Sequence, residues 1–397
     1  MFSDRNRRLS PSGTQAITVA VDQLERQGID IVDLGAGQPD FKTPDHIKAA
    51  GIAAISDNFT KYTPNAGVGE LRAAICSRYR EDYGINCSAA SVIVTAGGKQ
   101  ALFNAAMVLS GSGDEVITHA PGWPSLIQQI RIAEAEPIVV RTHQEDGFRL
   151  HADAVLAAVT SKTKVVIINS PGNPTGSLVS EDDLIKIATA AKEENFWIVL
   201  DLCYEHLVYD EVPHNLPGVL SRRIPEQFVL VGSLSKTYAM TGWRCGWAIG
   251  PEVFISACNA IQSHVTSNVS SITQRAGIAA LTGPQKCVAE MRENYRARRD
   301  QLIDWVESDL GIRCVRPGGA FYLFLDVSQL LSPGELRTSA SLAEALLREA
   351  HVAVTPGEAF DAPGYLRISY ATSLVRLREG VTRIKTFIQN RRNNDGE

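Results

Sequence analysis

The stretch VVIINSPGNPTGSLVSEDDLIKIATAAKEENFWIVLD, residues 165–201, decides the fold class of this chain. It opens with an apolar β-branched run at 165–169 and closes with a second run, Trp197–Asp201. Between the two runs, Glu181–Glu194 has the pattern of a helix, and Ser180 before it is a favourable N-cap residue. Strands that alternate with helices are joined by crossover connections, so this stretch predicts neighbouring strands of a mostly parallel sheet.

The same alternation extends to both sides of this stretch. Further short runs of β-branched or aromatic residues lie at 92–95, 115–118, 137–140, 228–232 and 247–249. Strands this apolar are covered on both faces, which predicts an α/β domain around a central sheet. The last hundred residues differ, because a long charged helix from Lys286 precedes only a few strands and helices. They predict a smaller α+β domain.

Length and composition limit the class of protein. A chain of 397 residues suggests two domains, and we place a large domain at 46–285 and a small one at 1–45 together with 286–397. A hydrophobic fraction of 44% and a charged fraction of 21% are those of a soluble globular protein. The net charge of -5 argues against nucleic acid or an anionic membrane as a partner.

The cysteines and the apolar runs indicate in which compartment of the cell the protein is found. The seven cysteines are scattered and form no CxxC pair, which is typical of reduced thiols rather than of a disulfide framework or a zinc site. No HExxH or EF-hand pattern supports a metal site. No secretory signal is visible, and the apolar runs are too short to span a bilayer. We therefore expect a cytoplasmic protein without a metal.

The segment SLSKTYAMTGWR, residues 233–244, carries the strongest chemical signal. It follows an apolar strand and places Lys236 in a setting of small and apolar residues. A desolvated lysine loses its proton more easily and can attack a carbonyl to form a Schiff base. Ser233 and Arg244 suit a phosphate, as a hydroxyl donor and a bidentate fork. From the residues alone, a surface lysine in a polar loop is an equally good interpretation.

Two further polar groups follow predicted strands. Asn173 lies in the loop NSPGNPTG (169–176), and Asp201 ends the strand Trp197–Asp201, with Tyr204 close behind. In open α/β sheets ligands bind beyond the carboxyl ends of the strands. A carboxylate there can keep a pyridine nitrogen protonated. A plain tight turn at 169–176 and a helix N-cap at Asp201 remain the simpler alternatives.

Glycine-rich turns occur at two more places. In TAGGKQ (95–100), Gly97 and Gly98 stand between a strand and a helix, where backbone N–H groups can approach an anion. The run GAGQPD (35–40) begins like GxGxxG but ends in Asp40, so it gives little support to a dinucleotide site.

Together these residues resemble the class I aminotransferases of pyridoxal-phosphate fold type I, near the bacterial aspartate and prephenate aminotransferases. The resemblance runs from about Leu9 to the final helix. Its motifs stand in the family's order: AGQPDF (36–41), KYTPNAG (61–67), GGKQALF (97–103), SPGNPTG (170–176), DLCYEHL (201–207), SLSKTYAMTGWRCGW (233–247), GAFYLF (319–324) and LRISYATS (366–373).

The resemblance implies pyridoxal 5'-phosphate as the cofactor. Lys236 would carry it as a Schiff base and shuttle a proton, and Asp201 would pair with the pyridine nitrogen. The other implied contacts are Asn173 and Tyr204 at the ring oxygen, Trp123 on the ring face, and Gly97, Gly98, Lys99, Ser233 and Arg244 at the phosphate, with Tyr62 reaching the phosphate of a neighbouring subunit in a homodimer.

The resemblance also implies a ping-pong transfer of an amino group between an L-amino acid and a 2-oxo acid. Arg367 would bind the α-carboxylate beside Gly37, with Trp123 and Asn173 also in contact with the substrate. Lys99 would bind the distal carboxylate of aspartate or glutamate, unless it only offsets the phosphate charge or points to solvent.

Some alternatives stay open. Thr63 matches the prephenate-using members, whereas the departures Gly122, Gly172 and Leu202-Cys203 leave the substrate preference undecided. An aminotransferase for aromatic, neutral or basic amino acids and a lyase on the same fold remain possible. A non-catalytic module that keeps the cofactor fold is a third.

Overall fold

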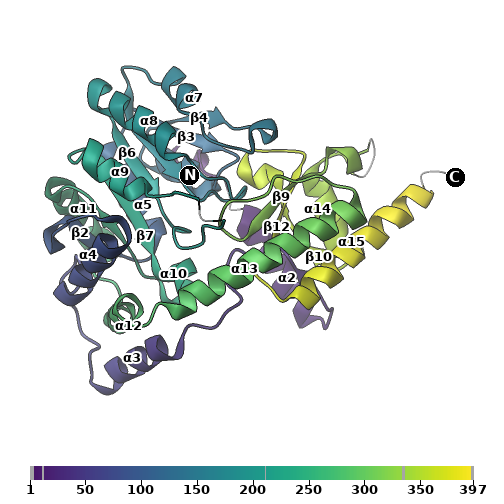
Figure 1. The fold of residues 1–397 in the computed structure, drawn as a ribbon, viewed down its shortest axis with the longest axis horizontal. Coiled ribbons are helices and arrows are strands. Elements are labelled where there is room, and N and C mark those ends of the chain that lie inside the picture. Colours follow the sequence, from purple (N-terminus) through teal and green to yellow (C-terminus); the bar gives the residue numbers. More distant parts are fainter. Residues whose placement is uncertain (1–3, 11–12, 211, 333–335, 395–397) are drawn as a thin grey trace.

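The computed structural model describes residues 4–10, 13–210, 212–332 and 336–394. It has two lobes, and the long helix α13 (Lys286–Trp305) runs from one to the other (Figure 1).

The larger lobe is built on a seven-stranded sheet with the order β2-β8-β7-β6-β5-β3-β4. Only β8 runs antiparallel to its neighbours in this sheet of the described chain, and the pairs from β7 across to β4 are parallel. The mostly parallel sheet predicted from the sequence is therefore confirmed. The strands are β2 (Val92–Thr95), β3 (Glu115–Ala120), β4 (Glu136–Arg141), β5 (Thr163–Asn169), β6 (Trp197–Asp201), β7 (Phe228–Ser233) and β8 (Gly246–Ile249).

Helices pack on both faces of this sheet. In β5, Val166 and Ile168 belong to one apolar cluster, whereas Val165 and Ile167 belong to another. Because successive side chains of a strand point to opposite faces, both faces are buried, as the unbroken apolar run predicted. The helices are α3 (Asp45–Ser56), α4 (Gly69–Tyr83), α5 (Gly98–Leu109), α6 (Pro124–Ile132), α7 (Ala152–Ala157), α8 (Glu181–Glu194), α9 (Leu216–Arg223), α10 (Leu234–Thr237), α11 (Glu252–Val265) and α12 (Ser271–Thr282).

The smaller lobe has an antiparallel sheet of order β11-β12-β9 and a parallel pair, β1 with β10. Its core is a separate apolar cluster that also takes in Tyr204 and Leu207 from the larger lobe. The elements are α1 (Asp4–Arg7), α2 (Gly13–Arg26), β1 (Val32–Asp33), β9 (Tyr322–Asp326), α14 (Ser339–Glu349), β10 (Val352–Ala353), β11 (Thr355–Pro356), β12 (Tyr365–Ser369) and α15 (Leu374–Asn394).

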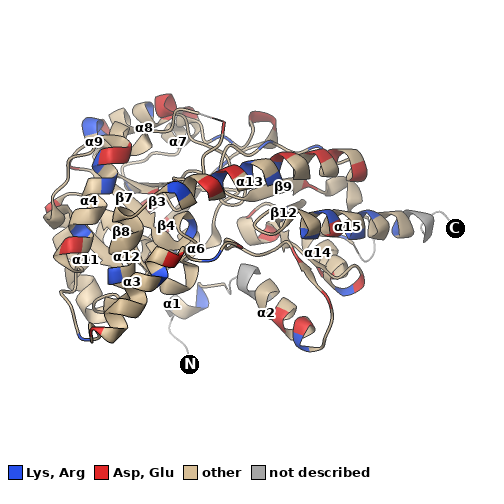
Figure 2. Ribbon diagram, turned by 60° about the horizontal axis from the view of Figure 1, so that its bottom comes forward, with Lys and Arg blue, Asp and Glu red and all other residues tan. Residues whose placement is uncertain are grey.

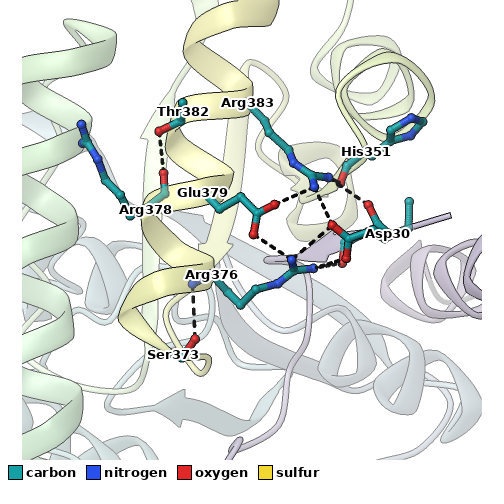
Figure 3. A network of polar contacts seen from close by, with 9 residues as sticks. Asp30, His351, Ser373, Arg376, Arg378, Glu379, Thr382 and Arg383 are labelled. Atoms are coloured by element: carbon teal, nitrogen blue, oxygen red, sulfur yellow. Dashed lines mark hydrogen bonds and ion pairs between the residues drawn. The ribbon is translucent and has the colours of Figure 1, made fainter.

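The N-terminal segment is tied to the smaller lobe by a charged network (Figure 3). The carboxylate of Asp30 accepts hydrogen bonds from Arg376 at 3.0 Å and from Arg383 at 2.6 Å, and Glu379 accepts from both arginines. Because β1 begins two residues after Asp30, the network anchors the chain shortly before residues 35–38, which line a cavity between the lobes. The domain boundaries at 45/46 and 285/286 stay a prediction.

The charged side chains are spread over the helices, with acidic and basic residues interspersed along α13 and α15 (Figure 2). Within the described ranges, every helix falls short of the length or the apolarity needed to cross a membrane.

Candidate active site

A cavity of about 410 Å³ lies at the carboxyl ends of β5, β6 and β7, which end at Asn169, Asp201 and Ser233. This volume is in the range of small-molecule sites. Residues of both lobes line it. Those predicted from the sequence are Gly37, Gly98, Lys99, Trp123, Asn173, Asp201, Tyr204, Ser233, Lys236, Arg244 and Arg367.

Lys236 lies in the short helix α10, which Ser233 caps by accepting a hydrogen bond from the Ser235 N–H. Its Nζ donates to the carbonyl oxygen of Gly37 at 2.6 Å, so it links the two lobes. The loss of water around the amine lowers the pKa of Lys236, and the nearby cations Arg367 and Arg244 act in the same direction. A lysine whose pKa is lowered in this way is a better nucleophile at neutral pH.

Asp201 places a carboxylate deep in the cavity wall, where only 4% of the residue is exposed. Burial raises its pKa to about 7, and a hydrogen bond from the Cys203 N–H at 3.1 Å opposes that rise. A cationic N–H donor would stabilise the charged form of such a carboxylate. A protonated pyridine nitrogen is a donor of this kind.

Gly97 and Arg244 lie together where β2 meets α5. Gly97 is the N-cap residue of α5 at φ 81° and ψ 166°. A Cβ atom added there would stand 2.6 Å from Nη2 of Arg244. That arginine is held by the carbonyl oxygens of Thr241 at 2.9 Å and Ala96 at 3.2 Å. A helix N-terminus next to a guanidinium suits a phosphate group.

Arg367 is the buried cation of the cavity. Its Nη1 donates to Oδ1 of Asn173 at 3.0 Å, and its Nη2 donates to the Gly35 carbonyl oxygen at 2.8 Å. Its Nε is buried and has no partner among the described residues. Because a guanidinium has five N–H donors, capacity remains for a carboxylate.

Lys99 is another cation that lines the same cavity. Its Nζ lies 5.0 Å from the centroid of the Trp123 ring, a cation–π distance. Burial lowers the pKa of Lys99, with a further contribution from Arg244. The carbonyl oxygen of Lys99 accepts a hydrogen bond from Gln129 at 2.8 Å, which fixes the backbone that presents it.

Several of the residues singled out in the sequence do not line the cavity, Gly97, Gly172 and Leu202 among them. Tyr62 is 92% exposed and does not line the cavity of its own chain. Thr63 also lies outside it, where its hydroxyl accepts a hydrogen bond from Gln274. Gly122 is not a lining residue either, and a Cβ on its backbone would stand 2.2 Å from the His119 carbonyl oxygen.

Other lining residues were not predicted. They include Tyr322, which lies within the GAFYLF motif but whose contacts depend on strand pairing. Local sequence gave no signal for Thr18, because it is a single hydroxyl in an amphipathic helix. The unpredicted lining residues are Thr18, Asp33, Gly35, Ala36, Gln38, Leu102, Asn169, Cys203, Ser235, Thr241 and Tyr322.

The side chains around the cavity fit pyridoxal 5'-phosphate. A lysine amine is present for the aldehyde, a buried carboxylate for the ring nitrogen, and a helix N-terminus with a guanidinium for the phosphate. Fold and site together define a pyridoxal-phosphate enzyme of fold type I.

Comparisons with known proteins narrow the class to a family. The family model for aminotransferase class I and II matches residues 29–384. An aspartate aminotransferase of Bacillus sp. (strain YM-2) is 39% identical, over 98% of this chain and 99% of that protein. The aspartate/prephenate aminotransferase of Thermus thermophilus is 42% identical, over 96% of this chain and 97% of that protein.

Solved structures agree with the sequence comparison. The aspartate aminotransferase of Thermus thermophilus with maleate superposes with a TM-score of 0.92 at 40% identity, and the match covers 97% of this chain and 99% of that one. The chain therefore belongs to the class I and II aminotransferase family. It is a pyridoxal-phosphate-dependent transaminase.

Proposed function

We propose that this transaminase acts on dicarboxylic amino acids such as aspartate and glutamate and on the matching 2-oxo acids. The observation that carries the proposal is that two cations besides Arg244, namely Arg367 and Lys99, line the cavity that also holds the Lys236 amine. A dicarboxylate needs two such partners, one for each carboxylate, and charge-assisted hydrogen bonds are the strong ones. Relatives named as aspartate aminotransferases, one of them solved with maleate, support the same choice.

The side chains divide the work between them. Arg367 binds the α-carboxylate and Lys99 the distal one, whereas Lys236 moves the proton at the substrate's α-carbon. The cofactor, when bound, withdraws electrons from that carbon and carries the amino group between the two halves of the reaction. Asp201 holds the ring nitrogen in its protonated form.

The remaining contacts hold the cofactor in place. Asn173 and Tyr204 hydrogen-bond its ring oxygen and Trp123 covers the ring face. Gly97, Gly98, Ser233 and Arg244 hold the phosphate, and Gly37 lies beside the substrate. The large domain, 46–285, supplies most of these groups, and the small domain, 1–45 with 286–397, supplies Gly37 and Arg367.

The enzyme acts as a homodimer in which Tyr62 serves the phosphate of the other subunit. The loop that bears it is fixed, because the Phe59 carbonyl oxygen accepts from Ser271 at 2.7 Å and Thr63 accepts from Gln274 at 2.9 Å. Tyr62 nevertheless projects into solvent. All seven cysteines are free, which supports a reducing, cytoplasmic setting.

Lys236 provides the direct test. Borohydride reduction of the loaded enzyme should fix the cofactor to the peptide that contains Lys236, as peptide mass spectrometry would show. Lys236→Ala should still take up the cofactor, but its turnover should fall by about 10²- to 10⁴-fold. The reason is that the variant lacks the amine that moves the proton at the α-carbon. Normal turnover in that variant, or label on another lysine, would refute the assignment.

A further inference from the structure

Tyr322 contacts residues of both lobes at the site. It is the first residue of β9, is only 1% exposed, and lines the cavity. Its hydroxyl lies 2.9 Å from the hydroxyl of Tyr204, which follows β6 in the larger lobe. Its ring lies under Arg367, with 4.3 Å between the guanidinium carbon and the ring centroid. One side chain therefore contacts a predicted cofactor ligand and the predicted carboxylate ligand.

Strand register produces this arrangement. β9 and β12 pair Tyr322 with Ser369 and Phe324 with Arg367, so Tyr322 and Arg367 are diagonal neighbours on one face of the sheet. Gly37 lies beside the phenol, since a Cβ there would stand 3.4 Å from its oxygen. The contact between Tyr322 and Arg367 is thus set by strand pairing within the smaller lobe and does not depend on a flexible loop.

The chemistry of the two phenols favours one direction for their hydrogen bond. Either hydroxyl can be the donor in this contact, but the Arg367 guanidinium lies directly over the Tyr322 ring, so its charge makes the Tyr322 phenol the more acidic of the two. The phenol beside a cation is the stronger donor. When Tyr322 donates to the oxygen of Tyr204, the single proton of Tyr204 is left for an acceptor in the cavity.

We propose that Tyr322 is a positioning residue that directs the Tyr204 hydroxyl toward the ring oxygen of the cofactor and holds the Arg367 guanidinium for the substrate α-carboxylate. The proposal rests on the proposed function, since it takes the ligands of cofactor and substrate from there. Its two parts are separable, because the hydroxyl serves Tyr204 and the ring serves Arg367.

Tyr322→Phe tests the hydroxyl. The visible absorbance of the bound cofactor changes when the nitrogen atom that joins it to Lys236 takes up a proton. A hydrogen bond to the ring oxygen of the cofactor favours the form in which this nitrogen is deprotonated. Removing the donor behind Tyr204 should therefore move the titration midpoint upward by roughly 0.3–1 pH unit. The affinity for maleate, a dicarboxylate probe, should stay unchanged because the ring remains.

Tyr322→Leu tests the ring. Loss of the cation–π contact should raise the Kd of maleate by about 2- to 30-fold. Tyr365→Phe is the matched control, because Tyr365 also lies on this sheet, stacked on Phe324 but outside the cavity. It should change neither the midpoint nor the Kd.

An unchanged midpoint in Tyr322→Phe would overturn the role of the hydroxyl, and an unchanged maleate Kd in Tyr322→Leu would overturn that of the ring. If Tyr322→Leu does not fold, Tyr322→Met removes the ring in its place, and an unchanged maleate Kd there would equally overturn the role of the ring. Failure of the proposed function looks different, because the unaltered enzyme would then show no titratable absorbance or no affinity for maleate.

Discussion

We expect the ammonium group of Lys99 to distinguish amino donors with a side-chain carboxylate from donors with an uncharged side chain. Its cation–π contact with Trp123 holds it beside the cavity, and a charge-assisted hydrogen bond to a distal carboxylate contributes about 1.5–3 kcal/mol. Lys99→Ala should accordingly lower kcat/KM for aspartate by about 10- to 150-fold. Alanine and phenylalanine lack that carboxylate, and their kcat/KM should hardly change.

The measurement is a set of steady-state rates with aspartate, glutamate, alanine and phenylalanine as donors. 2-Oxoglutarate, oxaloacetate, pyruvate and prephenate serve as acceptors. Equal losses for charged and uncharged donors would mean that Lys99 serves the cofactor phosphate, which would remove the basis for a dicarboxylate substrate.

Single residues were predictable where their role follows from local position. Asp201 ends a strand and Lys236 follows one, so both had to lie at the carboxyl edge of a parallel sheet. Tyr322 was not predictable in this way, because its contact residues are distant in the sequence. Tyr204 lies more than a hundred residues away from it, and Arg367 about 45 residues away. No local pattern carries information about pairs at that separation.

At the level of elements, the junction of β2 and α5 can be tested by a substitution at Gly97. Gly97 has φ 81° and ψ 166°, a backbone region that is essentially restricted to glycine and costs other residues about 1–3 kcal/mol. In Gly97→Ala the loop should relax away from Arg244. Cofactor binding would then have to restore the original loop conformation at a cost in free energy. The affinity of the apoenzyme for pyridoxal 5'-phosphate should fall by about 5- to 150-fold, measured by absorbance titration.

Gly113→Ala is the matched control, because Gly113 also has a positive φ of 91° but open space around its Cβ position. Both variants should lose thermal stability, whereas only Gly97→Ala should lose cofactor affinity. Equal affinities in the two variants would show that the β2–α5 turn does not hold the phosphate.

Whole elements were predicted well where a strong local signal marks both ends. Trp197–Asp201 and Glu181–Glu194 match the expected bounds, the latter because Ser180 accepts a hydrogen bond from the Asp183 N–H as an N-cap. Strands β10 and β11 are two residues long and show no periodic pattern, so only pairing with β1 and β12 defines them. Short elements of this kind depend on tertiary structure.

At the scale of the whole molecule, the architecture followed from the order of the elements. Alternating strands and helices predicted the larger lobe, and the change of pattern after residue 285 predicted the smaller one. The strand ends located the side of the cavity that the larger lobe forms. The part that the smaller lobe adds could be located only through the resemblance to a family, because chain segments as distant as Gly37, Lys236 and Arg367 meet there.

The surface around Tyr62 predicts that two chains assemble into a dimer. A second cavity, of about 670 Å³, shares Arg244 with the first and is also lined by Trp243, Asn268 and Ser270. Tyr62 is exposed on a fixed loop, and Ile52 and Ile55 of α3 are also exposed, at 64% and 55%. A second copy would cover apolar surface and bring a phenol to the phosphate site. Sedimentation should therefore give about twice the chain mass of 43.1 kDa.

Mixed dimers test whether the two chains share their sites. Tyr62→Ala and Lys236→Ala should each have low activity at limiting cofactor. A mixed dimer of the two has one intact site, because the chain with Lys236 receives Tyr62 from its partner. Half of the dimers in an equimolar, re-associated mixture are mixed, so activity should recover to about a quarter of that of the unaltered enzyme. Two Tyr62→Ala chains cannot complement each other and provide the control. A mixture that gains nothing, or a fully active monomer, would show that each chain builds its site alone.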